Sequence, residues 1–184
     1  MDELSDGQVR LRAWRVDEAG WVEARWYAGQ VGDPLIQQNT TEPAGLTAEQ
    51  VRQAIVTHAG DRDRRGWVIV AAEGGDLLGN AGLNLAAGTV SYWVAPAARG
   101  RGVATAAVRL MADYAFTTAG LTELRLWVRA GNQASARVAE KAGFTRTPEL
   151  DTTVTVRGEP WTAHYFTCTS PGTRDNRTAS PHQT

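Results

Sequence analysis

One stretch of the sequence, residues 96–118, combines charged donors and glycines at the start of an expected helix. It contains Arg99, Gly100, Arg101 and Gly102. The first turn of a helix has unpaired backbone N–H groups and the positive end of the helix dipole, so it binds anions. Glycine lets the backbone approach a phosphate closely, and arginine adds donors and charge. The stretch therefore predicts a pyrophosphate site.

Two common phosphate motifs do not fit this stretch. A P-loop requires a lysine after its last glycine, and the only lysine in the chain is Lys141. A dinucleotide-binding fingerprint requires a glycine or alanine at position 105 and an acidic residue after the next strand, but Thr105 and Asn132 stand there. The pattern that remains at positions 99–104, Arg-x-x-Gly-x-Ala, resembles the acyl-CoA loop of the GNAT N-acetyltransferases.

A second block after the expected helix strengthens this resemblance. Residues 123–129 alternate apolar and polar side chains like a strand. The chain then continues with Asn132, Ser135, Gly143 and Phe144. This spacing is that of the block which closes the cofactor site in the GNAT superfamily. Ser135, together with Ala139 where many members have tyrosine, resembles the branch that contains the ribosomal-protein N-terminal acetyltransferases. The resemblance runs from about residue 77 to residue 144.

The resemblance implies a fold and a co-substrate. The fold is α/β, with a mixed, mostly antiparallel central sheet of six to seven strands, about four flanking helices and a splayed parallel strand pair at the cofactor cleft. The co-substrate is acetyl-CoA, with no metal ion, and its pantetheine arm pairs with the strand that ends near Val94. The residues that the resemblance places around acetyl-CoA are Trp93, Val94, Arg99, Gly100, Arg101, Gly102, Val103, Ala104, Thr105, Asn132, Ser135 and Arg137.

The resemblance implies the catalytic groups only in part. Ser135 is expected to be the general acid for the leaving thiolate, and Asn132 to contact the cofactor and to cap the helix that follows it. Thr89 stands where relatives of this branch often have a glutamate as base, so no base is identified. Without a strong base, an α-amine with a pKa of about 7.7 to 8.0 is a better acceptor than a lysine side chain with a pKa of about 10.4.

The resulting hypothesis is transfer of an acetyl group to a primary amine by direct attack, and it leaves the acceptor open. The amine belongs either to a protein or peptide N-terminus or to a small molecule. One alternative is an antibiotic acetyltransferase of the aminoglycoside type, and another is a non-catalytic regulator that only binds acyl-CoA. A cationic small molecule would need acidic side chains around it, and the candidates are Asp33, Glu42, Glu149, Asp151 and Glu159.

The rest of the sequence supplies the elements that position this loop. Strands are expected at residues 9–15, 66–73, 77–85, 89–95, 123–129, 152–157 and 161–168. Helices are expected at residues 16–30, from a capping box at residue 47 to about residue 58, at 103–118 and from residue 133 onward. Residues 31–45 contain two prolines and two glycines, and they are expected to be irregular.

Length and composition indicate one domain. The 184 residues, 42% of them hydrophobic, suffice for a sheet-and-helix core at residues 9–168. The polar segments 1–8 and 169–184 are expected to be flexible. A formal charge of -1 gives no indication of nucleic-acid binding, and no apolar run is long enough to cross a membrane. We expect a cytoplasmic monomer or homodimer, in which the one cysteine, Cys168, forms no internal disulfide.

Overall fold

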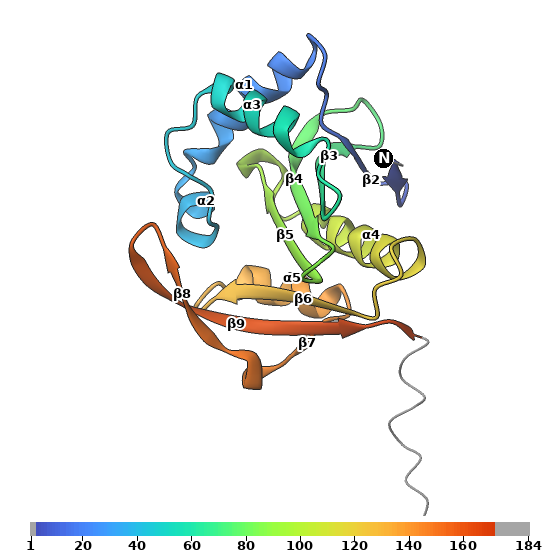
Figure 1. The fold of residues 1–184 in the computed structure, drawn as a ribbon, viewed down its shortest axis with the longest axis vertical. Helices are drawn as coiled ribbons and strands as arrows, with labels where there is room; N and C mark the ends of the chain where they lie inside the picture. The colour runs from blue at the N-terminus through green and yellow to red at the C-terminus, as the bar shows by residue number, and fades with distance from the viewer. Residues whose placement is uncertain (1–2, 172–184) are drawn as a thin grey trace, which may run out of the picture.

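A mixed β-sheet carries the loop that follows residue 95. The computed structural model describes residues 3–171, and in this range nine strands form one sheet in the order β1-β2-β3-β4-β5-β6-β9-β7, with β8 added on β9 (Figure 1). The strands are β1 (Leu4–Ser5), β2 (Val9–Ala13), β3 (Arg64–Ala71), β4 (Leu77–Asn84), β5 (Thr89–Val94), β6 (Glu123–Arg129), β7 (Thr145–Arg146), β8 (Thr152–Val156) and β9 (Glu159–Thr169). The helices are α1 (Gly20–Val31), α2 (Pro34–Asn39), α3 (Ala48–His58), α4 (Val103–Thr117) and α5 (Gln133–Lys141), with short 3-10 turns at η1 (Pro96–Ala98) and η2 (Pro148–Leu150).

The sheet opens between β5 and β6. β5 pairs with β4 along its whole length, from Thr89 opposite Asn84 to Val94 opposite Gly79. β5 and β6 are parallel, and their register has a single pair, Thr89 with Arg125. Because the two strands pair only where β5 begins, they diverge toward Val94, and Figure 1 shows them running apart. The splayed parallel pair that the sequence predicts is therefore present.

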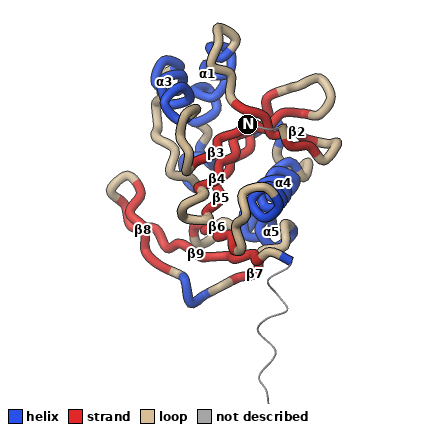
Figure 2. The backbone as a smooth tube through the Cα atoms, turned by 45° about the vertical axis from the view of Figure 1, so that its right-hand side comes forward, coloured by secondary structure: helices blue, strands red, loops and turns tan. Residues whose placement is uncertain are grey.

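Helices cover both faces of the sheet and form two separate cores. α4 and α5 lie on one face, and α1 and α3 pack beside each other on the other face (Figure 2). The larger core joins α4 and α5 to the sheet and includes Val90 of β5. The smaller core joins Val31 of α1 and Ile36 of α2 to Trp93 of β5. Since successive strand residues point to opposite faces, β5 is held from both sides.

The central strand-loop-helix unit follows the pattern in the sequence. β6 has the bounds that the alternation predicts, and its buried residues are Leu124, Leu126 and Val128. α4 ends at Thr117, one residue before the predicted end. Its buried stripe consists of Val103, Ala106, Ala107, Val108, Met111, Ala112 and Ala115. An apolar stripe of this period packs a helix against a sheet, so α4 fixes the loop before it.

The sheet has more strands in the described residues than the six to seven expected. The two additional strands, β1 and β7, have two residues each, which is too short for an alternating pattern to show. β1 pairs Leu4 with Leu11 at the sheet edge, so the expectation of a wholly flexible segment 1–8 is wrong in part. The expected flexible tail begins at residue 169, and from residue 172 onward it lies outside the described residues.

α2 corrects the expectation that residues 31–45 are irregular. Proline suits the first helical position because its φ is fixed there and no N–H is needed. Asp33 precedes Pro34 and caps the helix: its Oδ1 accepts the N–H groups of Leu35 and Ile36, both at 3.0 Å. Pro34 therefore starts a helix here instead of interrupting one.

Candidate active site

The edge of β5 that faces β6 is open at its end. The N–H of Arg125 donates to the carbonyl of Gly88 at 2.7 Å, and beyond Thr89 no strand within residues 3–171 pairs with this edge. Trp93 and Val94 end the strand, and the Trp93 side chain is buried on the α1 side. An unpaired strand edge is a template for another extended chain. The structure thus brings Trp93 and Val94 to the edge expected to contact pantetheine.

The loop after β5 turns through two glycines into α4. Gly100 and Gly102 have φ angles of 75° and 81°, which residues with a Cβ rarely adopt. Gly102 is the N-cap of α4 and has no side chain that could bond the first N–H groups. The N–H of Ala106 donates to the Gly102 carbonyl at 3.0 Å. The N–H groups of residues 103–105, which precede it in the first turn, therefore lie available to an anion at the positive end of the helix.

The loop is supported by Gln8 on one side, and a hollow in the protein surface lies beside it on another. The Nε2 of Gln8 donates to the carbonyl of Arg101 at 3.0 Å, so the segment before β2 supports the loop. A hollow of about 410 Å³ lies where the loop meets α1 and the start of β4. Trp26 and Gln30 of α1 line it together with Arg101. The Arg101 side chain can therefore reach a ligand beside the loop.

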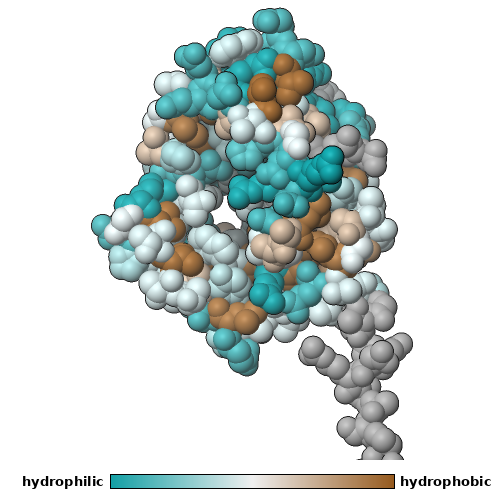
Figure 3. Space-filling model, viewed as in Figure 1, coloured by the Kyte–Doolittle hydropathy of each residue, from teal (hydrophilic) through white to brown (hydrophobic). Residues whose placement is uncertain are grey.

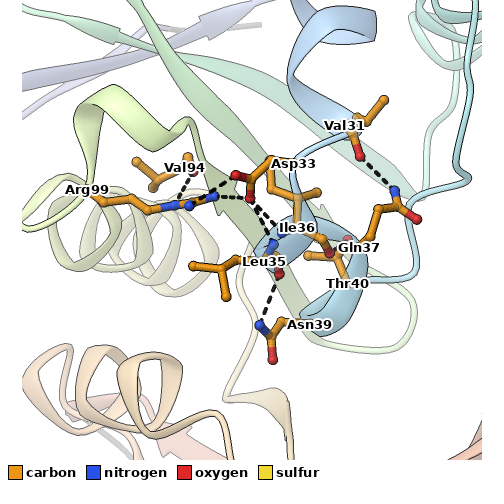
Figure 4. Close-up of polar contacts among 9 residues, drawn as sticks. All are labelled: Val31, Asp33, Leu35, Ile36, Gln37, Asn39, Thr40, Val94 and Arg99. Atoms are coloured by element: carbon orange, nitrogen blue, oxygen red, sulfur yellow. Dashed lines mark hydrogen bonds and ion pairs between the residues drawn. The ribbon is translucent and has the colours of Figure 1, made fainter.

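Arg99 is held by the protein itself (Figure 4). Its Nε donates to the Val94 carbonyl at 3.2 Å, and its Nη2 donates to Oδ1 of Asp33 at 2.5 Å. The hydrogen-bonded guanidinium holds the pKa of the Asp33 carboxyl below its ordinary value. Since Asp33 also caps α2, one carboxylate connects α2 to the loop. The assignment of Arg99 to the pyrophosphate stays a prediction, and the observed contacts give Arg99 a structural role.

The Ser135 side chain contacts β5 through the hydroxyl of Tyr92. Its Oγ lies 2.7 Å from the hydroxyl of Tyr92, and its N–H donates to Oδ1 of Asn132 at 3.1 Å. The predicted capping role of Asn132 is confirmed. Burial raises the pKa of the Tyr92 phenol to about 12, so this hydroxyl is neutral at pH 7. Two hydroxyls therefore bridge β5 and α5. Tyr92 was not expected in the site, because no pattern distinguishes it from other strand tyrosines.

Aromatic side chains and one carboxylate gather on the α1 side of β5. The ring of Trp26 stacks on Trp93 at 5.7 Å between centroids, and Tyr27 meets Trp93 edge-on at 5.0 Å. Oε1 of Glu42 accepts the indole N–H of Trp93 at 3.2 Å. Burial, and after it the nearby Glu42 carboxylate, raises the pKa of the Tyr27 phenol. A negative charge therefore lies beside the last residues of β5.

Two arginines fasten α2 and the loop after it to the other half of the sheet. Arg157, in the turn between β8 and β9, donates to the Glu42 carbonyl at 2.8 Å, and Arg129, the last residue of β6, donates to the Gln38 carbonyl of α2 at 2.5 Å. Both guanidinium groups lie over the ring of Trp161, with centroid distances of 4.2 Å for Arg129 and 5.2 Å for Arg157. Figure 3 shows the molecule hollowed in its middle, next to α2 and β5 in the orientation of Figure 1. The arginine contacts therefore join the segment around α2 to β6 and to the β8 and β9 hairpin.

The other residues expected around the cofactor divide by exposure. The Val103 side chain is buried in the core, so only its backbone can meet a ligand. Ala104 and Thr105 are half-buried in the first turn of α4. Arg137 is exposed on α5. The structure thus brings the loop, the start of α4 and the end of β5 together. The residues of these three segments are the main candidates for contacts with the cofactor.

The five acidic candidates for the acceptor side also separate. Asp33 contacts Arg99 and Glu42 contacts Trp93, so both carboxylates lie next to the end of β5. Asp151 is instead paired with Arg146, whose hydrogen bond lowers the pKa of the carboxyl. The remaining two, Glu149 and Glu159, are exposed on η2 and at the start of β9. Only the first pair lies where the sequence places the cofactor.

Within residues 3–171, no group of three or more His, Cys, Asp or Glu side chains is placed to hold a metal ion. No helix in the same range is long and apolar enough to cross a membrane.

Comparison with known proteins places the chain in a family. Residues 8–145, more than half of the chain, match the family described as "Acetyltransferase (GNAT) domain". Alpha/beta-tubulin-N-acetyltransferase 9 from Homo sapiens is 28% identical over 138 residues, which cover 67% of each chain. Spermidine N-acetyltransferase from Vibrio cholerae, solved with CoA and spermine, has a TM-score of 0.72 at 20% identity and covers 89% of this chain and 96% of its own. The ribosomal L7/L12 alpha-N-protein acetyltransferase, solved with coenzyme A, has a TM-score of 0.75 at 15% identity and covers 91% and 98%.

These likenesses agree with the motifs in the sequence. The two solved structures share the fold across almost all of the described residues, and one is of the ribosomal-protein branch that Ser135 and Ala139 indicate. The matched range includes both the glycine loop and the block from Asn132 to Phe144. The chain therefore belongs to the GNAT acetyltransferase family.

Proposed function

We propose that the protein transfers the acetyl group of acetyl-CoA to a primary amine by direct attack. The observation that carries the proposal is the open edge of β5, placed directly before the glycine loop and the start of α4. An extended pantetheine arm fits beside an unpaired strand, and a pyrophosphate fits the N–H groups of residues 103–105. Both groups belong to acetyl-CoA, so one ligand accounts for both features.

The residues at the opening support the chemical step. Acetyl-CoA supplies an activated thioester, and the protein has to position it, polarise its oxygen and protonate the thiolate that leaves. A backbone N–H at the end of β5, near Val94, is suited to polarise the oxygen. Ser135 is suited to donate to the thiolate, because Asn132 fixes its backbone and Tyr92 fixes its hydroxyl. This arrangement favours catalysis over passive acyl-CoA binding.

The acceptor is either an N-terminal α-amine of a protein or peptide or the amine of a small molecule. Similar proteins of both kinds support this range: one solved structure is named as an L7/L12 alpha-N-protein acetyltransferase, and the Vibrio cholerae enzyme is named for spermidine. Aminoglycoside-type antibiotics belong to the second group.

Calorimetry with acetyl-CoA, followed by a thiol-release assay, tests the proposal. The amine panel contains short peptides with free N-termini, spermidine and an aminoglycoside, and N-acetylated forms of the same peptides are the control. Acetyl-CoA is expected to bind, and thiol is expected to be released with at least one free amine and with none of the blocked peptides. Binding without release from any amine would instead support a non-catalytic acyl-CoA-binding regulator, and absence of binding would refute the proposal.

A further inference from the structure

We propose that the Glu42 carboxylate binds the ammonium group of the acceptor and takes its proton before the amine attacks the thioester. The inference rests on the proposed function, and it identifies the base that the sequence leaves open at Thr89. The strand β5 begins with Thr89 instead of the glutamate that relatives often have there, and a carboxylate reaches the other end of the same strand from the loop after α2.

The position of Glu42 is the first support. Its Oε1 accepts the indole N–H of Trp93 at 3.2 Å, and Trp93 directly precedes Val94 at the open end of β5. The carboxylate therefore lies beside the end of the strand that is expected to hold the thioester. A general base acts on an amine within hydrogen-bond reach, directly or through one water, so an amine bound between Glu42 and the thioester meets this requirement.

The backbone of Glu42 is fixed independently of its side chain. Its N–H donates to Oγ1 of Thr40 at 3.2 Å, and its carbonyl accepts donors from Gln37 at 3.2 Å and from Arg157 at 2.8 Å. Glu42 is thus attached to α2, to the β8 and β9 hairpin and to β5. Because the backbone is held by α2 and the hairpin and the carboxylate by Trp93, Glu42 loses little further freedom when it binds a cation.

The surroundings of the carboxylate suit an ammonium group. Trp26 stacks on Trp93 and Tyr27 meets Trp93 edge-on, so the carboxylate lies beside a cluster of aromatic rings, and aromatic rings attract cations. Partial burial strengthens the attraction between the carboxylate and an ammonium, since less water screens it. Among the described residues, the titratable or charged groups whose contacts reach Glu42 are Tyr27 of α1 and Arg157 of the hairpin. The raised pKa keeps Tyr27 a neutral hydrogen-bond donor to the carboxylate, as the Trp93 indole is, and Arg157 bonds the main-chain carbonyl. Within residues 3–171, the Glu42 carboxylate therefore has neutral donors and no ion pair, which leaves its charge to be balanced by a substrate cation.

The proton balance of the step is complete. One proton moves from the substrate ammonium to Glu42, and the neutral amine forms the C–N bond while the C–S bond breaks. Ser135 gives its hydroxyl proton to the leaving thiolate, and the second proton that leaves the nitrogen restores the Ser135 hydroxyl. Glu42 then releases its proton to solvent, so the products are the amide, the free thiol and one proton.

The variant Glu42→Gln tests the proposal, because glutamine keeps the size and an oxygen for the Trp93 N–H but removes the charge. The best amine of the panel is titrated into protein saturated with CoA, and its affinity is expected to fall by about ten- to a hundredfold. The kcat/KM for the amine at pH 7 is expected to fall by about a hundredfold or more. The affinity for acetyl-CoA and the melting temperature are expected to stay unchanged. Glu73→Gln, an exposed position in the turn before β4, is the matched control and is expected to behave like the wild type.

The pH dependence separates Glu42 from a merely structural residue. If Glu42 binds the ammonium form, kcat/KM in the wild type is nearly flat below the pKa of the amine. In Glu42→Gln only the neutral amine reacts, so kcat/KM is expected to rise about tenfold per pH unit up to that pKa. Glu42→Asp, which keeps the charge, is expected to restore part of the amine affinity.

Three outcomes would overturn the inference. A wild-type profile that already rises tenfold per pH unit would show that the enzyme waits for neutral amine and has no base. Unchanged amine affinity in Glu42→Gln, with thiol release intact, would remove Glu42 from the site while leaving the proposed function in place. Absence of thiol release from the wild type with every amine would refute the proposed function, and the role of Glu42 with it.

Discussion

Replacing Asp33 is expected to reduce the free energy of unfolding in two parts that different substitutions separate. One Asp33 carboxylate caps α2 through the N–H groups of Leu35 and Ile36, and it also pairs with Arg99. Asp33→Ala removes both interactions. Asp33→Asn removes only the charge, because asparagine caps helices about as well as aspartate.

The size of each part follows from the geometry. The cap contributes about 1 kcal/mol, as N-cap side chains usually do. The Arg99 side chain is 31% exposed and the Asp33 side chain is 17% exposed, so water screens this ion pair less than a pair on the open surface. It is therefore expected to contribute about 1 kcal/mol to the free energy of unfolding, the upper end for surface pairs. Asp33→Asn should therefore cost about 1 kcal/mol and Asp33→Ala about 2 kcal/mol. For a chain of this length, these correspond to decreases in Tm of about 2 to 4 °C and 4 to 8 °C.

The ion-pair part is expected to depend on pH. The Arg99 guanidinium lowers the pKa of Asp33 in the folded state. A lowered carboxyl pKa stabilises the fold fully above the unfolded value of about 3.9, and this stabilisation is lost as the pH falls through the lower folded pKa. The stability difference between the wild type and Asp33→Asn should thus be constant from pH 7 to about pH 5 and shrink below about pH 4.

Urea unfolding followed by tryptophan fluorescence at pH 7, 5, 4 and 3 measures these differences. Thr47→Ala, which removes the side-chain cap of α3 but touches neither Arg99 nor the loop, is the control for capping alone. If Asp33→Asn is as stable as the wild type at pH 7, the ion pair contributes nothing. If Asp33→Asn and Asp33→Ala are equally unstable, the cap contributes nothing and the division into two parts is wrong.

Other substitutions probe the two sides of the opening. Gly102→Val forces a branched side chain to a φ of 81° at the N-cap of α4, and it is expected to raise the Kd for acetyl-CoA at least tenfold in calorimetry. Gly120→Val, at a similar φ after the other end of α4, is the control and should lower only the stability of the fold. Ser135→Ala is expected to lower kcat about 10- to 1000-fold in the thiol-release assay with little change in that Kd, and an unchanged kcat would exclude Ser135 as the acid. Tyr92→Phe removes only the 2.7 Å bond to Ser135, so its kcat should fall less than that of Ser135→Ala, and a larger fall would make Tyr92 the donor.

The parts of the fold that the sequence predicts are those with local, periodic signals. β6 matches its alternating pattern residue for residue, and α4 matches its apolar stripe because both pack a single face onto the same core. The capping box at Thr47 is likewise present, with both of its hydrogen bonds. These elements carry the family motifs, so the family could be predicted along with them.

The contacts that complete the candidate site are not local. Arg99 and Asp33 are 66 positions apart, and Glu42 and Trp93 are 51 positions apart, so no spacing rule relates them. The glycine-loop pattern predicts that Arg99 binds a phosphate and gives no sign of its carboxylate partner, which becomes its neighbour only in the folded chain. A local signal did exist for α2, since an aspartate before a proline is typical of a helix start. The second proline and the glycines of the same segment favour irregular structure instead.

The segment from Asp33 to Glu42 is fastened at both ends to the strand and loop expected to hold the cofactor. Asp33 binds Arg99 after β5, and Glu42 binds Trp93 at the end of β5. A shift of residues 93–99 when acetyl-CoA binds must therefore also move Glu42, and free-energy coupling of this kind is reciprocal. If Glu42 binds the amine, Asp33→Asn should weaken amine binding when it is introduced into the wild-type protein. Introduced into the Glu42→Gln variant, it should have little further effect, because the Glu42 charge that the segment holds in position is already gone. A double-mutant cycle on amine affinity should then show a coupling of at least about 0.5 kcal/mol, whereas additive effects would mean that the two ends of the segment act independently.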